Sequence, residues 1–355
     1  MQFDRVGAHD DVVNDIAFDF YGRRVATCSS DKNIRVWDLE TKSNSGAVGD
    51  AKSNYSCSEI SRAHQSSIWR LSWAHPEFGQ LLASCSEDRT TCIWEEQESI
   101  GGGGEYIKKN ERTNSSRQMV GQRWQLKTTL SESRKSVNDV EFAPRHLGLK
   151  IATASADGFV RVYEAPDVFS LNMWQLEHSV EVEQTVPAPL SSQPAASGEA
   201  GATTSAGSSK SEHGLTCLTW NVCPFEPAKL AVGGYSSRAV VLTQDSGDTG
   251  GSNKWREECV LGEHTGIIHD IAWAPAMGRS YHLIATASRE PSFKVHTLQR
   301  LENGALEYTS TQAVEAVGHS AIWRVAWNAT GTVLATSSED GIVALWRKDF
   351  LGVWK

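Results

Sequence analysis

Hydrophobic residues in this chain occur in short runs of four to seven positions, separated by polar residues, glycine and proline. Within a run the large side chains alternate or cluster, and Val, Ile, Trp and Thr are prominent. Such runs are typical of β-strands, and no long helical periodicity accompanies them. The pattern therefore predicts an all-β protein.

The runs recur in units along the chain. The stretch that begins IWRLSW at Ile68 is nearly repeated, 254 residues later, by the stretch that begins IWRVAW at Ile322. Using the shared ending of these stretches as a guide, we find six units, around residues 9–38, 64–94, 138–164, 215–242, 269–296 and 319–346. Each contains three short apolar runs, and repeats of this kind indicate a repeat architecture.

A fourth strand is plausible in the linkers between units, for example at 56–60, 125–130, 258–261 and 311–317. Four strands in a unit of roughly 40 residues are the signature of a β-propeller blade. We therefore predict a single propeller domain over 1–355 with six blades. Because propellers hold about four to eight blades, the ring either closes by itself or stays open with two edges. The terminal segments 1–6 and 349–355 are each one strand long, and either is able to close the ring.

Three units share a set of four side chains in which a hydroxyl precedes Asp by four residues and Trp follows it by six. The sets are His9, Thr27, Asp31 and Trp37; His64, Ser84, Asp88 and Trp94; and His319, Thr336, Asp340 and Trp346. An Asp in a tight turn accepts local hydrogen bonds, and a His on the incoming loop can donate to it. With the hydroxyl and the indole the four form a buried network. We interpret them as structural tetrads.

The same residue types also form hydrolytic triads. A triad occurs once, in a pocket, around an activated nucleophile. The present set recurs at a fixed spacing and always ends in Trp. This arrangement favours a protein that is not an enzyme.

Three units depart from the tetrad. The third has Thr153, Asp157 and Tyr163 but no His at the expected place, and the fourth lacks both Asp and Trp. The fifth has Arg289 where Asp is expected. We expect these blades to be held by packing and by strand hydrogen bonds, without the network.

Composition narrows the class of protein further. The net charge of −9 disfavours direct nucleic-acid binding, which needs clustered Lys and Arg. No run of 18 apolar residues is present, and the N-terminus lacks a secretory signal pattern, so no direct membrane insertion is expected. The seven cysteines include no CxxC and indicate reduced thiols, with no metal and no cofactor expected.

Four segments are of low complexity: 41–55, 98–121, 186–212 and 245–253. Small polar residues dominate them, so burial cannot offset the cost of ordering them. We interpret them as loop inserts of one domain. The GGGG run at 101–104 has no GxxxxGK[ST] context and does not indicate a phosphate site.

The repeated IWR motif leaves two alternatives open. Trp69, Trp73, Trp323 and Trp327 fit packing between inner strands. Alternatively Trp69 and Trp323 lie on a rim and anchor a partner, because Trp is a frequent hot spot of interfaces. Arg70 and Arg324, which follow them, have the same two interpretations: structural cation–π or turn partners, or partner contacts.

The ending IRVWD (34–38), with a His about 22 residues before Asp31, resembles WD40 repeats. Five segments resemble more closely the Seh-type nucleoporin, a WD40 relative of the Sec-thirteen coat protein; they lie at 18–38, 72–90, 142–167, 271–288 and 323–341. This resemblance implies an open six-bladed propeller that receives a seventh blade from a partner chain, by addition of strands. The implied partner is an α-solenoid subunit, or another propeller subunit, of the Y-shaped nuclear pore complex or of the GATOR assembly, which acts on TORC-one signalling in response to amino acids.

The resemblance therefore implies a non-catalytic scaffold at the nuclear envelope, at the lysosomal surface and in the cytoplasm. One alternative is a vesicle-coat subunit like the Sec-thirteen protein. The other is a WD40 receptor that reads short peptides, for which we expect an Arg-rich or aromatic cluster at the mouth of the channel.

Overall fold

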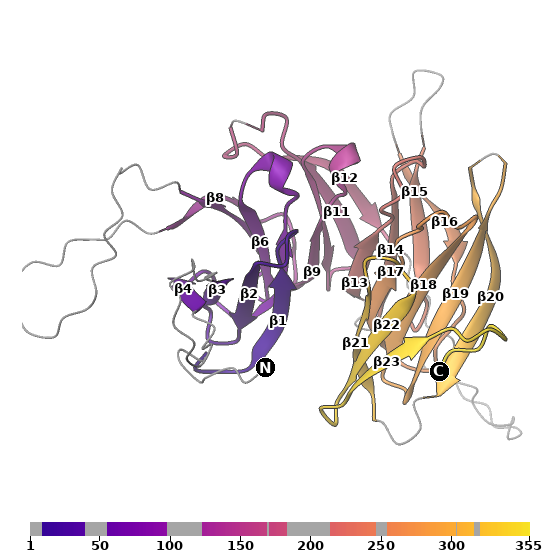
Figure 1. Ribbon diagram of the computed structural model, residues 1–355. Coiled ribbons are helices and arrows are strands. Elements are labelled where there is room, and N and C mark those ends of the chain that lie inside the picture. The colour runs from indigo at the N-terminus through magenta and orange to yellow at the C-terminus, as the bar shows by residue number, and fades with distance from the viewer. Residues whose placement is uncertain are drawn as a thin grey trace, which may run out of the picture.

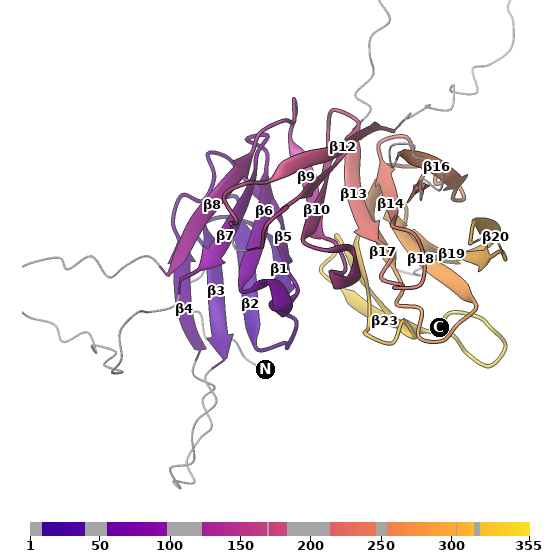
Figure 2. The ribbon, with the colours of Figure 1, turned by 90° about the horizontal axis from the view of Figure 1, so that it is seen from above.

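The computed structural model describes residues 9–39, 55–97, 123–168, 170–182, 214–245, 254–302, 304–315 and 320–355. Within these ranges 23 strands form six antiparallel sheets, five with four strands and one with three. The sheets follow one another around a common centre (Figures 1 and 2). The prediction of an all-β, six-bladed propeller is confirmed.

Each blade is built from strands in chain order. Blades 1 to 3 consist of β1 (Val13–Phe18), β2 (Arg24–Ser29), β3 (Ile34–Leu39) and β4 (Tyr55–Ile60); β5 (Ile68–Trp73), β6 (Leu81–Ser86), β7 (Thr91–Glu96) and β8 (Trp124–Leu130); and β9 (Val137–Phe142), β10 (Lys150–Ser155), β11 (Phe159–Glu164) and β12 (Gln175–Glu181). Blades 4 to 6 consist of β13 (Leu215–Trp220), β14 (Lys229–Gly234), β15 (Val240–Gln244) and β16 (Trp255–Val260); β17 (Ile268–Trp273), β18 (Tyr281–Ser288), β19 (Ser292–Arg300) and β20 (Leu306–Glu315); and β21 (Ile322–Trp327), β22 (Val333–Ser338) and β23 (Val343–Arg347). Two 3₁₀ turns, Pro76–Phe78 and Arg145–Leu147, connect strands in blades 2 and 3.

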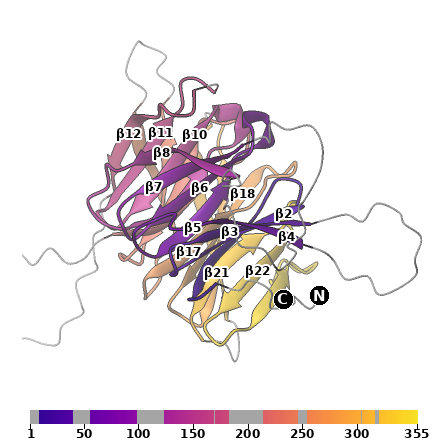
Figure 3. The ribbon, with the colours of Figure 1, turned by 90° about the vertical axis from the view of Figure 1, so that its left-hand side faces the viewer.

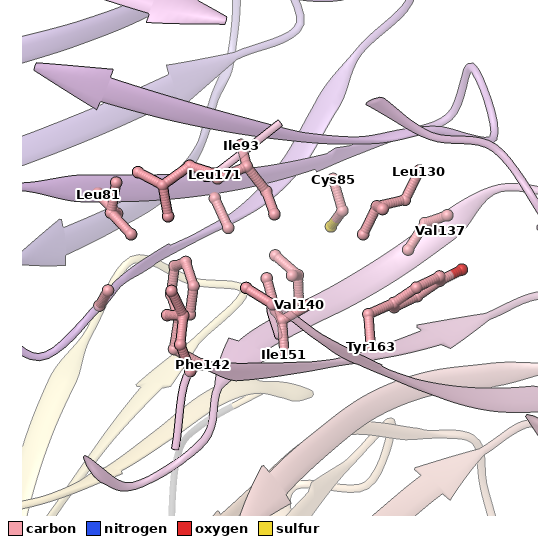
Figure 4. Packing of buried hydrophobic residues seen from close by; sticks show 14 residues of the cluster. Leu81, Cys85, Ile93, Leu130, Val137, Val140, Phe142, Ile151, Tyr163 and Leu171 are labelled. Atoms are coloured by element: carbon pink, nitrogen blue, oxygen red, sulfur yellow. The ribbon is translucent and has the colours of Figure 1, made fainter. Parts of the chain in front are cut away.

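Alternation along the middle strands explains the packing of the blades. In β6, Leu81, Ala83 and Cys85 pack against blade 3, whereas Leu82 packs against blade 1. Successive residues of a strand point to opposite faces, so a strand buried on both faces must be apolar throughout. Figure 4 shows Leu81, Cys85 and Ile93 of blade 2 facing the side chains of blade 3.

Five clusters of buried apolar side chains join the six blades. They lie between blades 1 and 2, 2 and 3, 3 and 4, 4 and 5, and 5 and 6. Among the described residues no such cluster joins blade 6 to blade 1. Figure 3 views the molecule from the side of blades 1 and 2, with blade 6 in yellow.

The C-terminal segment does not close the ring, which was one of the two roles that its length allowed. The segment 349–355 folds back on its own blade: a β-bridge joins Lys348 to Trp354, and the Arg347 N–H donates to the Lys355 carbonyl at 2.8 Å. Trp354 is buried against Trp327, with ring centroids 5.5 Å apart. The C-terminal segment therefore covers the end of blade 6 and does not reach blade 1. The segment 1–6 lies outside the described residues.

The proposed fourth strands at 56–60, 125–130, 258–261 and 311–317 correspond to β4, β8, β16 and β20. The low-complexity inserts lie almost wholly outside the described residues, which include only the ends of 41–55 and 245–253. In the part of the chain that is described, no helix has the length and apolar character needed to cross a membrane.

Candidate functional site

The first tetrad is assembled on blade 1. His9 bridges two residues, with Nδ1 2.8 Å from Asp31 Oδ2 and Nε2 2.8 Å from Thr27 Oγ1. The Trp37 indole donates to the same hydroxyl at 3.2 Å. The Asp31 carboxylate also accepts the N–H of Asn33 in its own turn, at 2.9 Å. The four side chains therefore tie the loop before β1 to the β2–β3 hairpin.

The second tetrad, on blade 2, has the same geometry. His64 lies 3.0 Å from Asp88 and 2.7 Å from Ser84, and the Trp94 indole donates to Ser84 at 3.0 Å. Burial opposes the charge on His64, but the contacts with Asp88 and Cys92 together outweigh it and raise the pKa of His64 to about 9. Burial also opposes ionisation of Asp88, yet the bonds from His64 and Thr90 lower its pKa. The pair is therefore ionic at neutral pH.

The third tetrad is described only in part, because His319 lies outside the described residues. The Trp346 indole donates to Thr336 Oγ1 at 2.9 Å, and the Asp340 N–H donates to Ser320 Oγ at 3.0 Å. The indole–hydroxyl contact thus matches the one in blades 1 and 2.

The expectation that the fifth blade lacks a network is wrong. His264 contacts Thr286 at 2.6 Å, Thr286 contacts His296 at 2.9 Å, and His296 contacts Thr311 at 2.7 Å. The His296 imidazole occupies the place of the Trp indole. Glu290, four residues after Thr286 and six before His296, stands at the Asp position of the tetrad and lies 3.6 Å from His264. The prediction that put Arg289 at this position was one residue too early.

The third blade uses an ion pair in the place of the missing His. Arg161 Nη2 lies 2.7 Å from Asp157 Oδ2, and both side chains are buried. The Tyr163 hydroxyl donates to Glu132 at 3.0 Å. An internal Arg–Asp pair therefore holds the turn that His and Asp hold elsewhere.

Sequence reasoning missed a ring of side chains at the third position of each inner strand. In order of blades it consists of Asp15, Arg70, Asp139, Cys217, Asp270 and Arg324. The three aspartates each accept the backbone N–H of the next blade: the acceptor–donor pairs are Asp15 with Leu71, Asp139 with Leu218, and Asp270 with Val325, each at 2.9 Å. The motifs NDIAF, NDVEF and HDIAW carried this signal.

A tryptophan returns each of these contacts. The indoles of Trp73, Trp220 and Trp327, at the ends of β5, β13 and β21, donate to backbone carbonyls of the preceding blade. The acceptors are Ala17, Glu141 and Ala272, each at 3.1 Å. Asp and Trp thus clamp blade 1 to 2, blade 3 to 4, and blade 5 to 6. Blades 2, 4 and 6 are the second members of these pairs; blades 2 and 6 carry the IWR motif, whereas blade 4 has LTC at the same positions.

Arg70 lies at the centre of this ring. Its guanidinium hydrogen bonds to Asp270 on blade 5, lies 3.5 Å from Asp139 on blade 3, and lies 4.0 Å from Asp15 on blade 1. Burial raises the pKa of Asp139 to about 7, although Arg70 acts in the opposite direction. Trp69 donates its indole N–H to Ser136 on blade 3 at 3.1 Å. The polar groups of Trp69 and Arg70 are therefore engaged within the chain.

The channel opens into a cavity of about 470 Å³ beside this ring. Its lining includes Arg70, Asp139 and Asp270 together with Phe18 and Phe20. Phe20 makes an edge contact with His75, with ring centroids 4.7 Å apart. The cavity lining thus combines charged and aromatic side chains.

The sheets of blades 1 and 6 each leave one apolar face open. On β1, Ile16 and Phe18 are 57% and 65% exposed, and on β23, Val343 and Leu345 are 68% and 70% exposed. In the four blades between them, the residues of both faces are buried in clusters. Large exposed apolar surfaces mark interaction sites. These two faces are the candidate functional site, called here the open faces.

One side chain spans the open faces at the channel. Arg324 Nη2 donates to the Asn14 carbonyl of blade 1 at 3.1 Å, and Nη1 lies 4.0 Å from Asp270. Beside it, Trp323 stacks on His269 with ring centroids 4.2 Å apart and is 49% exposed. Of the four proposed contact residues, Arg324 is the one that reaches across the open faces, whereas Trp323 packs on blade 5 and is half exposed.

Comparison with known proteins gives a consistent result. The family model described as "WD domain, G-beta repeat" matches residues 3–38, 55–95, 124–164 and 311–347. The chain is 38% identical to Nucleoporin SEH1 of Homo sapiens and 38% identical to Nucleoporin SEH1 of Pongo abelii, and 37% identical to Nucleoporin SEH1 of Danio rerio. Each alignment covers 98% of this chain and 84% of the relative. The repeats, the six blades and the identity over nearly the whole length agree, and the chain belongs to the SEH1 nucleoporin family of WD40-repeat proteins.

Proposed function

We propose that this chain is a scaffold subunit that binds a partner by taking a donated seventh blade between its open faces. The observation that supports it is the pair of open faces, on which Phe18 and Leu345 are largely exposed. A sheet inserted there adds two interfaces of the kind that already joins the other blades. Added strands gain affinity from backbone hydrogen bonds and specificity from side-chain pockets.

The orientation of blade 1 supports the same proposal. Trp94 of blade 2 packs toward blade 1, so the tetrad face of a blade is the one that meets the preceding blade. On blade 1, Ala26 and Cys28 pack toward blade 2, and Thr27 therefore points to the open side. A donated blade would therefore lie where the other blades have their preceding blade.

The names of the relatives suggest the assembly in which this chain serves. Its members are named nucleoporins, and we propose that this chain serves in the Y-shaped scaffold of the nuclear pore, at the nuclear envelope. The resemblance described above adds a second assembly, GATOR, at the lysosomal surface, with a role in TORC-one signalling. In both, the proposed donor is an α-solenoid subunit, with further propeller subunits as neighbours.

The tetrads also support a role without catalysis. A nucleophilic Ser needs a free hydroxyl and a base that can accept its proton. The Ser84 hydroxyl is fully buried and accepts the Trp94 indole N–H, and its His64 neighbour has a pKa of about 9. The His–Ser–Asp set therefore serves the fold.

Affinity isolation of the tagged chain at native expression, followed by mass spectrometry, tests the proposal. We expect nuclear pore scaffold proteins, together with amino-acid-signalling proteins, to be recovered with the parent chain. The variants Phe18→Glu and Leu345→Glu should lose them, because each places a charge in a donated interface. The matched control is Phe225→Glu, at a residue of blade 4 that is 82% exposed and lies away from the open faces.

Other outcomes identify the alternatives. Recovery of vesicle-coat proteins alone indicates a coat subunit like the Sec-thirteen protein. Recovery of the same proteins by all three variants contradicts the donated blade. In that case the cavity lined by Asp139 and Phe20 makes a reader of short basic peptides the leading candidate.

A further inference from the structure

Blades 2 and 6 carry the same Trp–Arg pair at the same place on their inner strands. In blade 2 the pair holds the next blade, because Trp69 donates to Ser136 and Arg70 lies 3.5 Å from Asp139, both of blade 3. Ser136 precedes Asp139 by three residues, directly before β9. A hydroxyl and a carboxylate at this spacing are thus what the pair contacts on the following blade.

In blade 6 the arginine of the pair faces the open side of the ring, whereas Trp323 stacks on His269 of the preceding blade. Among the described residues, Arg324 reaches a backbone carbonyl of blade 1, at Asn14, and a carboxylate of the preceding blade, Asp270, at 4.0 Å. Its side chain is 35% exposed, compared with 16% for Arg70. A guanidinium has five N–H donors in a planar fork, and a carboxylate is the acceptor that matches it. Arg324 therefore has donors available for the blade that follows.

The ring of inner-strand residues indicates what that blade carries. Each blade that follows an even-numbered blade of this chain has Asp at the third position of its inner strand, namely Asp139 after blade 2 and Asp270 after blade 4. A donated blade follows blade 6. On the strength of the proposed function, we propose that the donated inner strand presents an Asp or Glu to Arg324.

The rest of the partner segment follows from the open faces. Ile16 and Phe18 line one side and Val343 and Leu345 the other, so a sheet between them must be apolar on both faces. In such a segment a single carboxylate is expensive to bury unless it is paired. Arg324 supplies that pair and so selects one register of the strand. On binding, it exchanges the Asn14 carbonyl for the partner's carboxylate.

Site-specific photocrosslinking in the full-length chain tests this inference. The probe is p-benzoyl-L-phenylalanine, placed at Trp323 in one variant, at Leu345 in a second, and at Phe225 as the control. We expect Trp323 and Leu345 to crosslink to one segment of one protein, and the peptide joined at Trp323 to contain Asp or Glu within four residues. Phe225 should not give this crosslink.

The outcomes separate the inference from the proposed function. A crosslink at Leu345 with no carboxylate near the Trp323 peptide overturns the carboxylate while the donated blade stands. No crosslink at either position contradicts both.

The crosslinked segment then serves as the ligand in a binding measurement. Arg324→Gln should raise its dissociation constant by about 30-fold or more, because a buried carboxylate loses its partner. Arg256→Gln, at an exposed arginine of blade 4 paired with Asp245, is the control and should leave affinity unchanged. Arg324→Glu should abolish binding, and replacing the partner's carboxylate by Arg should restore it. Failure of that exchange, with both variant chains melting like the parent, refutes the pairing.

Discussion

The His64–Asp88 pair predicts a specific dependence of stability on pH. The ring of His64 has a pKa of about 9 in the fold, against an ordinary value of 6.5. A group whose pKa is raised on folding contributes stability that is fully present below the unfolded value and declines as the pH rises to the folded value. His64 should therefore stabilise the protein at pH 6, and this contribution should fall between pH 6.5 and pH 9.

The structure sets the size of the effect. The shift of His64 corresponds to about 3 kcal/mol at about 1.4 kcal/mol per pKa unit. The lowered pKa of Asp88 reflects the same ion pair, so its shift is not added to that of His64. In Asp88→Asn the amide keeps the size of the side chain but removes the charge that holds the proton on His64.

Urea unfolding of the parent and of Asp88→Asn at pH 6, 7.5 and 9 measures this contribution. The parent should be more stable than the variant by about 3 kcal/mol at pH 6, and the difference should shrink to below about 1 kcal/mol at pH 9. Glu87→Gln, at the exposed neighbouring position, controls for general loss of negative charge. An equal difference between parent and Asp88→Asn at pH 6 and pH 9 would refute the ionic interpretation of the tetrad.

Four further predictions concern the ring, the clamps and the fifth blade. Arg70→Gln should destabilise the chain by about 3–5 kcal/mol, because Asp139 and Asp270 lose their buried counter-charge. The loss measured by urea unfolding should be larger at pH 8 than at pH 5, since Asp139, with a pKa of about 7, is largely protonated at pH 5. Arg324→Gln in the free chain should change the free energy of unfolding by less than about 1 kcal/mol, since its side chain is partly exposed, and a loss as large as that of Arg70→Gln contradicts the assignment of different roles to the two arginines. Trp73→Phe keeps an aromatic ring but removes the hydrogen bond to Ala17, so thermal unfolding should report a loss of about 1–2 kcal/mol; an unchanged midpoint argues against the clamp. His296→Ala should lower the free energy of unfolding by about 2–4 kcal/mol, because Thr286 and Thr311 are left without their shared partner. A loss as small as that of His146→Ala, at an exposed histidine, shows that blade 5 does not use the network.

Much of the fold follows from short-range pattern in the chain. Strand alternation, the turn Asp and the spacing from Thr27 to Asp31 to Trp37 are local, because they act within one hairpin. These features predicted six units and two fully described tetrads, whose side chains the structure brings within hydrogen-bonding distance. A fourth strand was predicted in the linkers, but the location of β12 and the fold-back of 349–355 were not.

The network of blade 5 keeps the spacing of the tetrad but changes two of its residue types. The prediction placed Arg289 where Asp belongs and treated the network as lost, whereas the spacing of four residues from Thr286 leads to Glu290. In the fold, Glu290 and His296 reach the same point in space with different side chains. Backbone geometry fixes where a side chain must end, and several residue types reach that place.

The amino-acid sequence by itself therefore determined the blade, its repeat and its internal tetrad. Only the tertiary structure decided how the blades meet: which aspartate holds which neighbouring N–H, that Arg70 is enclosed, and that the equivalent Arg324 lies at the open faces. The physical reason is one of range. A tetrad joins residues of one repeat, whereas the contact of Arg70 with Asp270 joins residues 200 positions apart, and its existence depends on the curvature of the whole ring.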